Sequence, residues 1–356
     1  MKKMVLLLCA VLTLLSFAEE EVLKAILVPN MTIFYECNLK ALGTMPNMED
    51  KLEKMDNVPM SDALRMNSAT EKMMKALGLD PKKDISKMDM VAALNDQQLA
   101  SLQRGAKMDK WPFCGAVETL KPIDVATAPE AITTYLSEIG EGGSCTPFKV
   151  GELNGLKLKM PVSKKMKISE LTLLFPPDGK GMFFGTEAEV KAAAERLVSK
   201  NLNAMPAEFI DLKKIAKPNA HYLVLFKVPA ELQSNLKGKA IAQAQGNPME
   251  AAILGEMANV SGAAISCTMS EKGFEVVVAT QLPTPENAMA FKNTLLDGMV
   301  KPILSMLVTQ YAAQQLDFIE GLKTSLEGSV AKIETVVTFE DLNSIAGHAM
   351  QQMQQN

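Results

Sequence analysis

Residues 171–190 read LTLLFPPDGKGMFFGTEAEV and hold a complete supersecondary unit. Two short apolar runs, 171–175 and 182–185, flank Pro-Pro-Asp-Gly, a turn sequence typical of a β-hairpin. Thr186 follows, three residues before Glu189, so its hydroxyl can accept a hydrogen bond from a first-turn amide while the acid opposes the positive end of the helix dipole. The stretch therefore predicts strand, turn, strand and helix in that order.

The same helix start occurs at three further places, because Thr127, Thr284 and Thr338 each stand three residues before an acid or amide. Apolar residues follow at helical spacing, and after Thr127 they are Ile132, Tyr135, Leu136 and Ile139. The helix after Thr284 should end or kink at Lys301-Pro302. Two more hairpins are expected over 263–280 and 323–339. We predict an α+β fold in which antiparallel β-hairpins are covered by amphipathic helices.

The spacing of the four threonines indicates an internal duplication. Thr284 lies 157 residues after Thr127, and Thr338 lies 152 residues after Thr186. This repeat predicts two related α+β halves, 19–215 and 216–356, with a Met-rich helical insertion at about 45–110 in the first half. Residues 113–118 look like a strand, but no hairpin partner for them is visible in the sequence.

Several segments carry a resemblance to known proteins. They are the strand that ends in Asn-Leu-Lys40, the run from Gly78 to Asp84, the hairpin at 173–179 that leads into Phe184-Gly-Thr-Glu, and the closing strand and helix. Together they resemble a loose class of exported bacterial proteins of unknown function built from repeated hairpin and helix units. The resemblance covers most of the chain after the leader. It implies a fold style and export, and it carries over no catalytic residue.

Residues 1–18 are typical of a cleavable signal peptide. Lys2 and Lys3 precede an apolar run that reaches Phe17, and Ala18 offers a cleavage site before Glu19. A membrane-spanning helix needs about 18 or more apolar residues, so this run is too short to be one, and no later run is long enough either. We therefore expect an exported protein, in the periplasm or at the cell surface or outside the cell, with no transmembrane segment after cleavage.

Charge and cysteine content restrict the partners and the chemistry. The chain has 37 basic and 41 acidic residues, and loss of Lys2 and Lys3 leaves 35 and 41, a net charge near −6. This balance argues against a nucleic-acid partner. Four cysteines remain after cleavage, at positions Cys37, Cys114, Cys145 and Cys267. They permit up to two disulfides, whose pairing the sequence does not give, or four buried thiols.

No reactive constellation stands out in the sequence. Only His221 and His348 are present, one at the start of an apolar strand and one near a Gln-rich end. We expect His221 to be structural, and we assign no catalytic, cofactor-binding or metal-binding residue. The favoured interpretation is an exported binding or scaffold protein without enzymatic activity, whose partner is an unidentified protein or small molecule.

Two other functions remain open. Clustered methionines select Cu(I), which would fit a copper-handling protein, although methionine is also a common core residue. The methionines in question are Met45, Met48, Met73, Met74, Met350 and Met353, with His348 in the tail. The other alternative is an exported hydrolase that uses two dispersed carboxylates.

Overall fold

The computed structural model describes residues 21–40, 68–80, 83–95, 97–98, 112–161, 169–304 and 317–341. These residues form two units. The N-terminal unit comprises the described residues up to position 206 except Ser68, and the C-terminal unit begins at Ala207. The predicted signal peptide, the Gln-rich tail and most of the Met-rich stretch lie outside the described residues.

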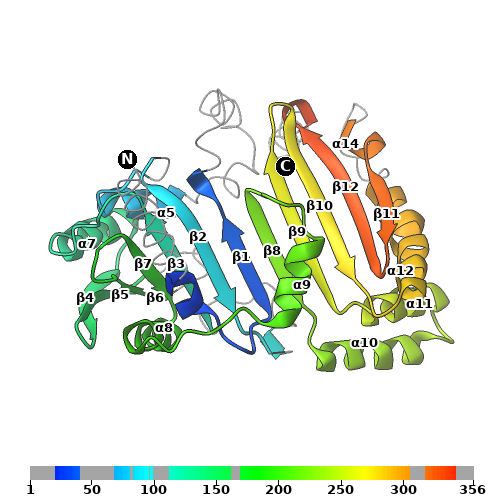
Figure 1. Cartoon of the computed structure of the whole chain (residues 1–356), viewed down its shortest axis with the longest axis horizontal. Coiled ribbons are helices and arrows are strands. Elements are labelled where there is room, and N and C mark those ends of the chain that lie inside the picture. The colour runs from blue at the N-terminus through cyan, green and yellow to red at the C-terminus, as the bar shows by residue number, and fades with distance from the viewer. Residues whose placement is uncertain are drawn as a thin grey trace, which may run out of the picture. The chain divides into compact units, whose positions relative to one another are not determined.

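The N-terminal unit is built on an antiparallel sheet in the order β1-β2-β3-β7-β6-β5-β4 (Figure 1). Its strands are β1 (Ile33–Cys37), β2 (Ile85–Ala92), β3 (Phe113–Thr119), β4 (Ser144–Val150), β5 (Leu153–Lys159), β6 (Glu170–Leu174) and β7 (Gly181–Gly185). Its helices include α5 (Ser68–Ala76), α7 (Ala128–Ile139) and α8 (Glu187–Ser199). Helix α8 packs on β3, β6 and β7 through Val190, Ala193 and Ala194, which are fully buried. The hairpin and helix predicted from residues 171–190 are confirmed.

The C-terminal unit has the strand order β8-β9-β10-β12-β11, again antiparallel. Its strands are β8 (Tyr222–Lys227), β9 (Gly262–Met269), β10 (Gly273–Gln281), β11 (Lys323–Glu327) and β12 (Val330–Thr338). Its helices include α9 (Ala207–Ile215), α10 (Ala230–Gln243), α11 (Pro248–Ala258), α12 (Pro285–Phe291) and α14 (Asp317–Glu320). A buried cluster that includes Phe291, Leu295 and Leu296 joins the helices to Ala331 on β12.

The helix after Thr284 does not end at Lys301-Pro302. From Lys292 to Val300 it is a π-helix, η2, and helical structure continues through residue 304. The amide of Lys301 still bonds to the carbonyl of Leu296, five residues back. Pro302 therefore falls where the bonding pattern changes from π to α.

All four predicted helix starts are present, but the threonines act differently. Thr284 accepts a bond from the amide of Asn287 (3.2 Å), and Thr338 accepts one from Asp341 (3.0 Å). Thr127 and Thr186 precede their helices without a capping bond and donate instead to the carbonyls of Asp124 and Phe113. Residues 342–349, which we expect to continue the last helix, lie outside the described part of the chain.

The prediction of a helical insertion at about 45–110 needs correction. This stretch contains helix α5, but it also contains β2, which lies between β1 and β3 and is the missing partner of residues 113–118. Asp89 occupies a buried position in the middle of β2, so the apolar alternation that identifies a strand is interrupted there. None of the helices in the described ranges is long and apolar enough to cross a membrane.

Candidate functional site

A groove of about 370 Å³ lies on one face of the C-terminal sheet, against the loop that follows α9. Its lining includes the charged residues Lys217, Lys323, Lys332, Glu275 and Glu334. Its apolar lining includes Ile215, Pro218, Val277 and Val336. The groove therefore combines both signs of charge with an apolar surface.

The register of three strands places these side chains together. Glu334 on β12 lies opposite Val277 on β10 and Lys323 on β11, and Val336 lies opposite Glu275. Residues directly opposite in a sheet share a face, and residues two apart along a strand do so too. Residues 57 and 61 positions apart in sequence thus line one wall.

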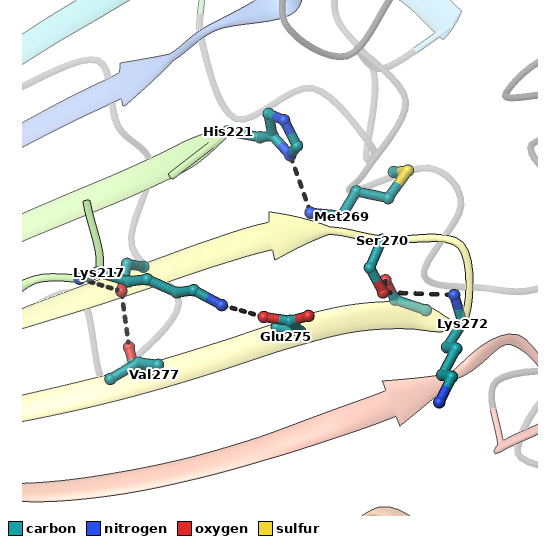
Figure 2. Close-up of polar contacts among 9 residues, drawn as sticks. Lys217, His221, Met269, Ser270, Lys272, Glu275 and Val277 are labelled. Atoms are coloured by element: carbon teal, nitrogen blue, oxygen red, sulfur yellow. Dashed lines mark hydrogen bonds and ion pairs between the residues drawn. The ribbon is translucent and has the colours of Figure 1, made fainter. Parts of the chain in front are cut away.

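A buried serine fixes the loop that carries Lys217. The amide of Lys217 donates to Oγ of Ser266 (3.0 Å), and that hydroxyl donates to the carbonyl of Val277 (3.4 Å), as Figure 2 shows. Ser266 is completely buried, so its two bonds form away from water. The loop is held on the sheet, and the Lys217 ammonium forms an ion pair with Glu275.

A second ion pair lies at the hairpin end of the groove, between Lys332 and Glu327. The hydrogen bond from Lys332 lowers the pKa of the Glu327 carboxyl. Because Glu327 is 75% exposed, water screens this pair and the carboxylate can change partners easily.

His221 sits at the start of β8 and has a structural role. Its Nδ1 accepts a hydrogen bond from the amide of Met269 (2.9 Å) (Figure 2). Its own amide donates to the carbonyl of Cys267 (3.0 Å). Burial lowers the pKa of His221. The side chain is therefore neutral near pH 7, with its proton on Nε2.

The four cysteines are free thiols in the structure. Burial raises the pKa of Cys37 to about 12 and that of Cys267 to about 11, and it also raises the pKa values of Cys114 and Cys145. Nucleophilic cysteines have lowered pKa values, because the thiolate is the reactive form. These four are therefore not activated as nucleophiles.

A charged cluster lies in the N-terminal sheet. Lys87 on β2 pairs with Glu36 on β1 (3.2 Å) and with Asp89 (3.1 Å), whose side chain is only 4% exposed. Glu36 and Asp89 are direct partners across the two strands. The lysine therefore compensates two carboxylates that would otherwise repel each other inside the sheet.

A wider groove of about 600 Å³ lies between α5 and α7, with Lys72 and Lys75 on one side and Glu130 and Glu138 on the other. Burial raises the pKa of Tyr135, which also lines it. Residues 41–67, which directly precede α5, lie outside the described part of the chain. The groove of the C-terminal unit is therefore taken as the candidate site.

Only two of the methionines named for a copper site lie in the described part of the chain. Met73 and Met74 are buried in α5, where they serve as core residues. Met45, Met48, Met350, Met353 and His348 lie outside the described residues. Within the described ranges, no three or more His, Cys, Asp or Glu side chains form a group that could hold a metal ion.

Comparison with known proteins gives only distant structural neighbours. No family and no curated protein matches the chain. Crystal form III of TP0453 aligns over 91% of this chain and 97% of its own, with 10% identity and a TM-score of 0.42. Crystal form I aligns over 92% and 96%, with 10% identity and a TM-score of 0.41. Crystal form IV aligns over 90% and 94%, with 9% identity and a TM-score of 0.38.

Proposed function

We propose that the protein is an exported binding protein without enzymatic activity, and that the groove of the C-terminal unit holds its ligand. The observation that carries the proposal is the groove itself, a preformed hollow in which opposite charges surround an apolar surface. The signal-peptide pattern of residues 1–18 supports a location in the periplasm or at the cell surface.

The ion pairs in the groove indicate the chemistry of the ligand. Lys217 and Glu275 are 32% and 37% exposed, and pairs of this kind contribute little to stability. A ligand ammonium can therefore replace Lys217 at Glu275, and a ligand carboxylate can replace Glu275 at Lys217, at small cost. Val277, Val336 and Ile215 would contact an apolar part of the ligand beside these charged groups. A short peptide with charged termini and an apolar centre has these properties.

The test uses the exported full-length protein and a set of tripeptides with apolar central residues. Tripeptides are first screened by the shift in melting temperature, and those that shift it are titrated by calorimetry. The double variant Lys217→Glu with Glu275→Lys keeps the pair but exchanges the two charges. We expect it to bind a selected tripeptide at least about tenfold more weakly, because each ligand charge then meets a like charge.

A matched control is available in the same unit. Lys227 and Glu208 form an exposed pair (2.6 Å) that does not line the groove. Exchanging the charges of this pair should leave tripeptide binding unchanged. Equal affinity of the Lys217/Glu275 exchange variant and the parent protein would show that the groove is not the binding site, and the absence of any binding tripeptide would refute the ligand class.

A further inference from the structure

The outer strand of the C-terminal sheet, β11, presents backbone groups that point away from the sheet. Odd-numbered residues of β12 bond toward β10, as shown by the bonds from Leu282 to the carbonyl of Ser329 (3.0 Å) and from Phe339 to that of Lys272 (3.3 Å). Even-numbered residues of β12 therefore bond toward β11, where their partners are Lys323, Ser325 and Glu327. The amides and carbonyls of Thr324 and Leu326 point outward.

These outward groups are open in the part of the chain that the structure describes. No hydrogen bond reaches the backbone amide or carbonyl of Thr324 or Leu326 from any described residue beyond β12. The hydroxyl of Thr324 donates a hydrogen bond to Oδ1 of Asp297 (2.7 Å). Leu326 packs on the buried cluster that includes Phe291, Leu295 and Leu296. The strand is thus anchored on one face and open along its edge.

In the N-terminal unit, the strand that corresponds to β11 is not at the edge of the sheet. There β6 and β7 form the corresponding hairpin, and the outer edge of β6 is covered by β5, which in turn pairs with β4. Hairpin β4–β5 has a two-residue turn, so Val150 bonds inward to Leu153, and the alternation places Pro147 in an outward position. A proline has no N–H to offer another strand, and natural proteins block edges in this way. Strand β11 contains no proline.

The sequence of β11 is complementary to itself. Lys323 begins the strand, Ser325 is its centre and Glu327 ends it. When two copies run antiparallel about Ser325, Lys323 of each copy lies opposite Glu327 of the other, and Thr324 lies opposite Leu326. The outward groups of Thr324 and Leu326 then form four hydrogen bonds between the copies. A parallel arrangement would instead place like charges next to each other.

We propose that two copies of this protein associate through their β11 strands, antiparallel and centred on Ser325, with a cross-strand pair of Lys323 and Glu327 at each end. The arrangement has the two-fold symmetry that most protein dimers share. Lys323, Ser325 and Glu327 are all exposed and lie on the face of the groove, so the contact continues the sheet without unfolding any described element.

The association is expected to be weak. Five residues on each side bury far less than the roughly 1,200 Å² of a typical stable interface, so the dimer should form only at high protein concentration. Glu327 already pairs with Lys332 and Lys323 lies opposite Glu334 within one copy, so the new contacts extend an existing charge network.

Sedimentation velocity of the unliganded full-length protein, from low micromolar to several hundred micromolar, tests the proposal. We expect a reversible monomer–dimer equilibrium. Lys323→Glu and Glu327→Lys should each weaken it by about tenfold, because each places like charges across the contact, and the double variant should restore it. Lys149→Glu, on the edge that contains Pro147, should have no effect.

A second variant tests the backbone bonds. Thr324→Pro removes one outward N–H and leaves the bonds to β12 intact, as Pro147 does in β4. A folded Thr324→Pro protein, with the circular dichroism spectrum of the parent, should remain monomeric. A parent protein that stays monomeric throughout, or a dimer insensitive to both single charge changes, would overturn the proposal. Because no ligand is present, this result is independent of tripeptide binding in the groove.

Discussion

The two units of this protein have the same connectivity and differ in what was added to it. In each, a first strand is followed by helical structure, two adjacent antiparallel strands, a further helix and a closing hairpin, giving the orders β1-β2-β3-β7-β6 and β8-β9-β10-β12-β11. The N-terminal unit adds hairpin β4–β5 beyond β6. The outermost strand of the N-terminal unit is therefore β4, which contains Pro147, whereas that of the C-terminal unit is β11, which contains no proline. Common descent of the two units remains a prediction, which superposition of the two sheets would test.

The interiors of the sheets differ as well. In the N-terminal unit, β1 and β2 enclose the charged cluster of Glu36, Lys87 and Asp89. In the C-terminal unit, the buried polar residue of β9 is the neutral Ser266, which bonds to two backbone groups. The same layout thus accommodates an ion-paired cluster in one unit and a buried hydroxyl in the other.

The largest effect is expected where strands approach most closely. A Cβ on Gly273 of β10 would overlap the carbonyl of Val337, and one on Gly185 of β7 would overlap that of Phe113. Both glycines also have positive φ angles, 153° and 151°. Gly273→Ala or Gly185→Ala should therefore destabilise its unit by about 3 kcal/mol or more, measured by urea unfolding.

Gly255 in α11 is the matched control, since a Cβ there meets nothing within 4 Å. Gly255→Ala should stabilise the protein by about 0.5 to 1 kcal/mol, because alanine is the better helix former. Equal effects at Gly273 and Gly255 would show that the close approach does not constrain the fold.

An intermediate effect is expected at the charged cluster. Lys87→Met leaves two carboxylates uncompensated in the sheet and should cost about 3 kcal/mol, again by urea unfolding. Lys191→Met, on the exposed side of α8, should change stability by less than about 0.5 kcal/mol. If the two variants behave alike, the cluster is not an energetic feature of the N-terminal sheet.

The same cluster has a predicted pH dependence. Burial acts to lower the pKa of Lys87, but Asp89 and Glu36 outweigh it, and the pKa is raised above 10.5. A raised pKa means that the folded state holds the proton more tightly, so this stabilisation is complete below pH 10.5 and is lost as pH rises through the folded-state pKa. The parent protein should lose more stability than Lys87→Met across that range.

The smallest effect on stability is expected at two helix starts, those at Thr284 and Thr127. Thr284→Ala removes a capping bond and should cost about 1 kcal/mol, whereas Thr127→Ala should cost only a few tenths, because Thr127 makes no capping bond. The melting temperatures of the two variants provide the measurement. A larger loss for Thr127→Ala would indicate that its bond to the carbonyl of Asp124 matters more than the cap.

The sequence predicts the elements that follow local rules. The three hairpins and four helix starts are visible because turn residues, apolar alternation and capping residues lie within a few positions of one another. Strand β2 is hidden by buried Asp89, and β4 by its exposed edge position and Pro147. Helix α10 buries no residue, and the apolar residues of α11 are not confined to one face, so neither shows the stripe that identifies a surface helix.

The groove could not be predicted from the sequence. Lys217, Glu275 and Glu334 are far apart in the chain and meet only through strand register and a loop held by Ser266. No local signal marks any of the three, because isolated Lys and Glu residues are common on protein surfaces. By contrast, the place of His221 at the start of an apolar strand predicts a structural role for its side chain.

The π-helix between Phe291 and Lys301 lies in the connection between β10 and β11. Each π turn holds more residues than an α turn, and the ion pair of Lys292 and Asp297 (2.5 Å) joins positions five apart, as that spacing requires. The strands on either side are fixed by their registers. A change in length within this helix would therefore leave the register of β10 and β12 unchanged.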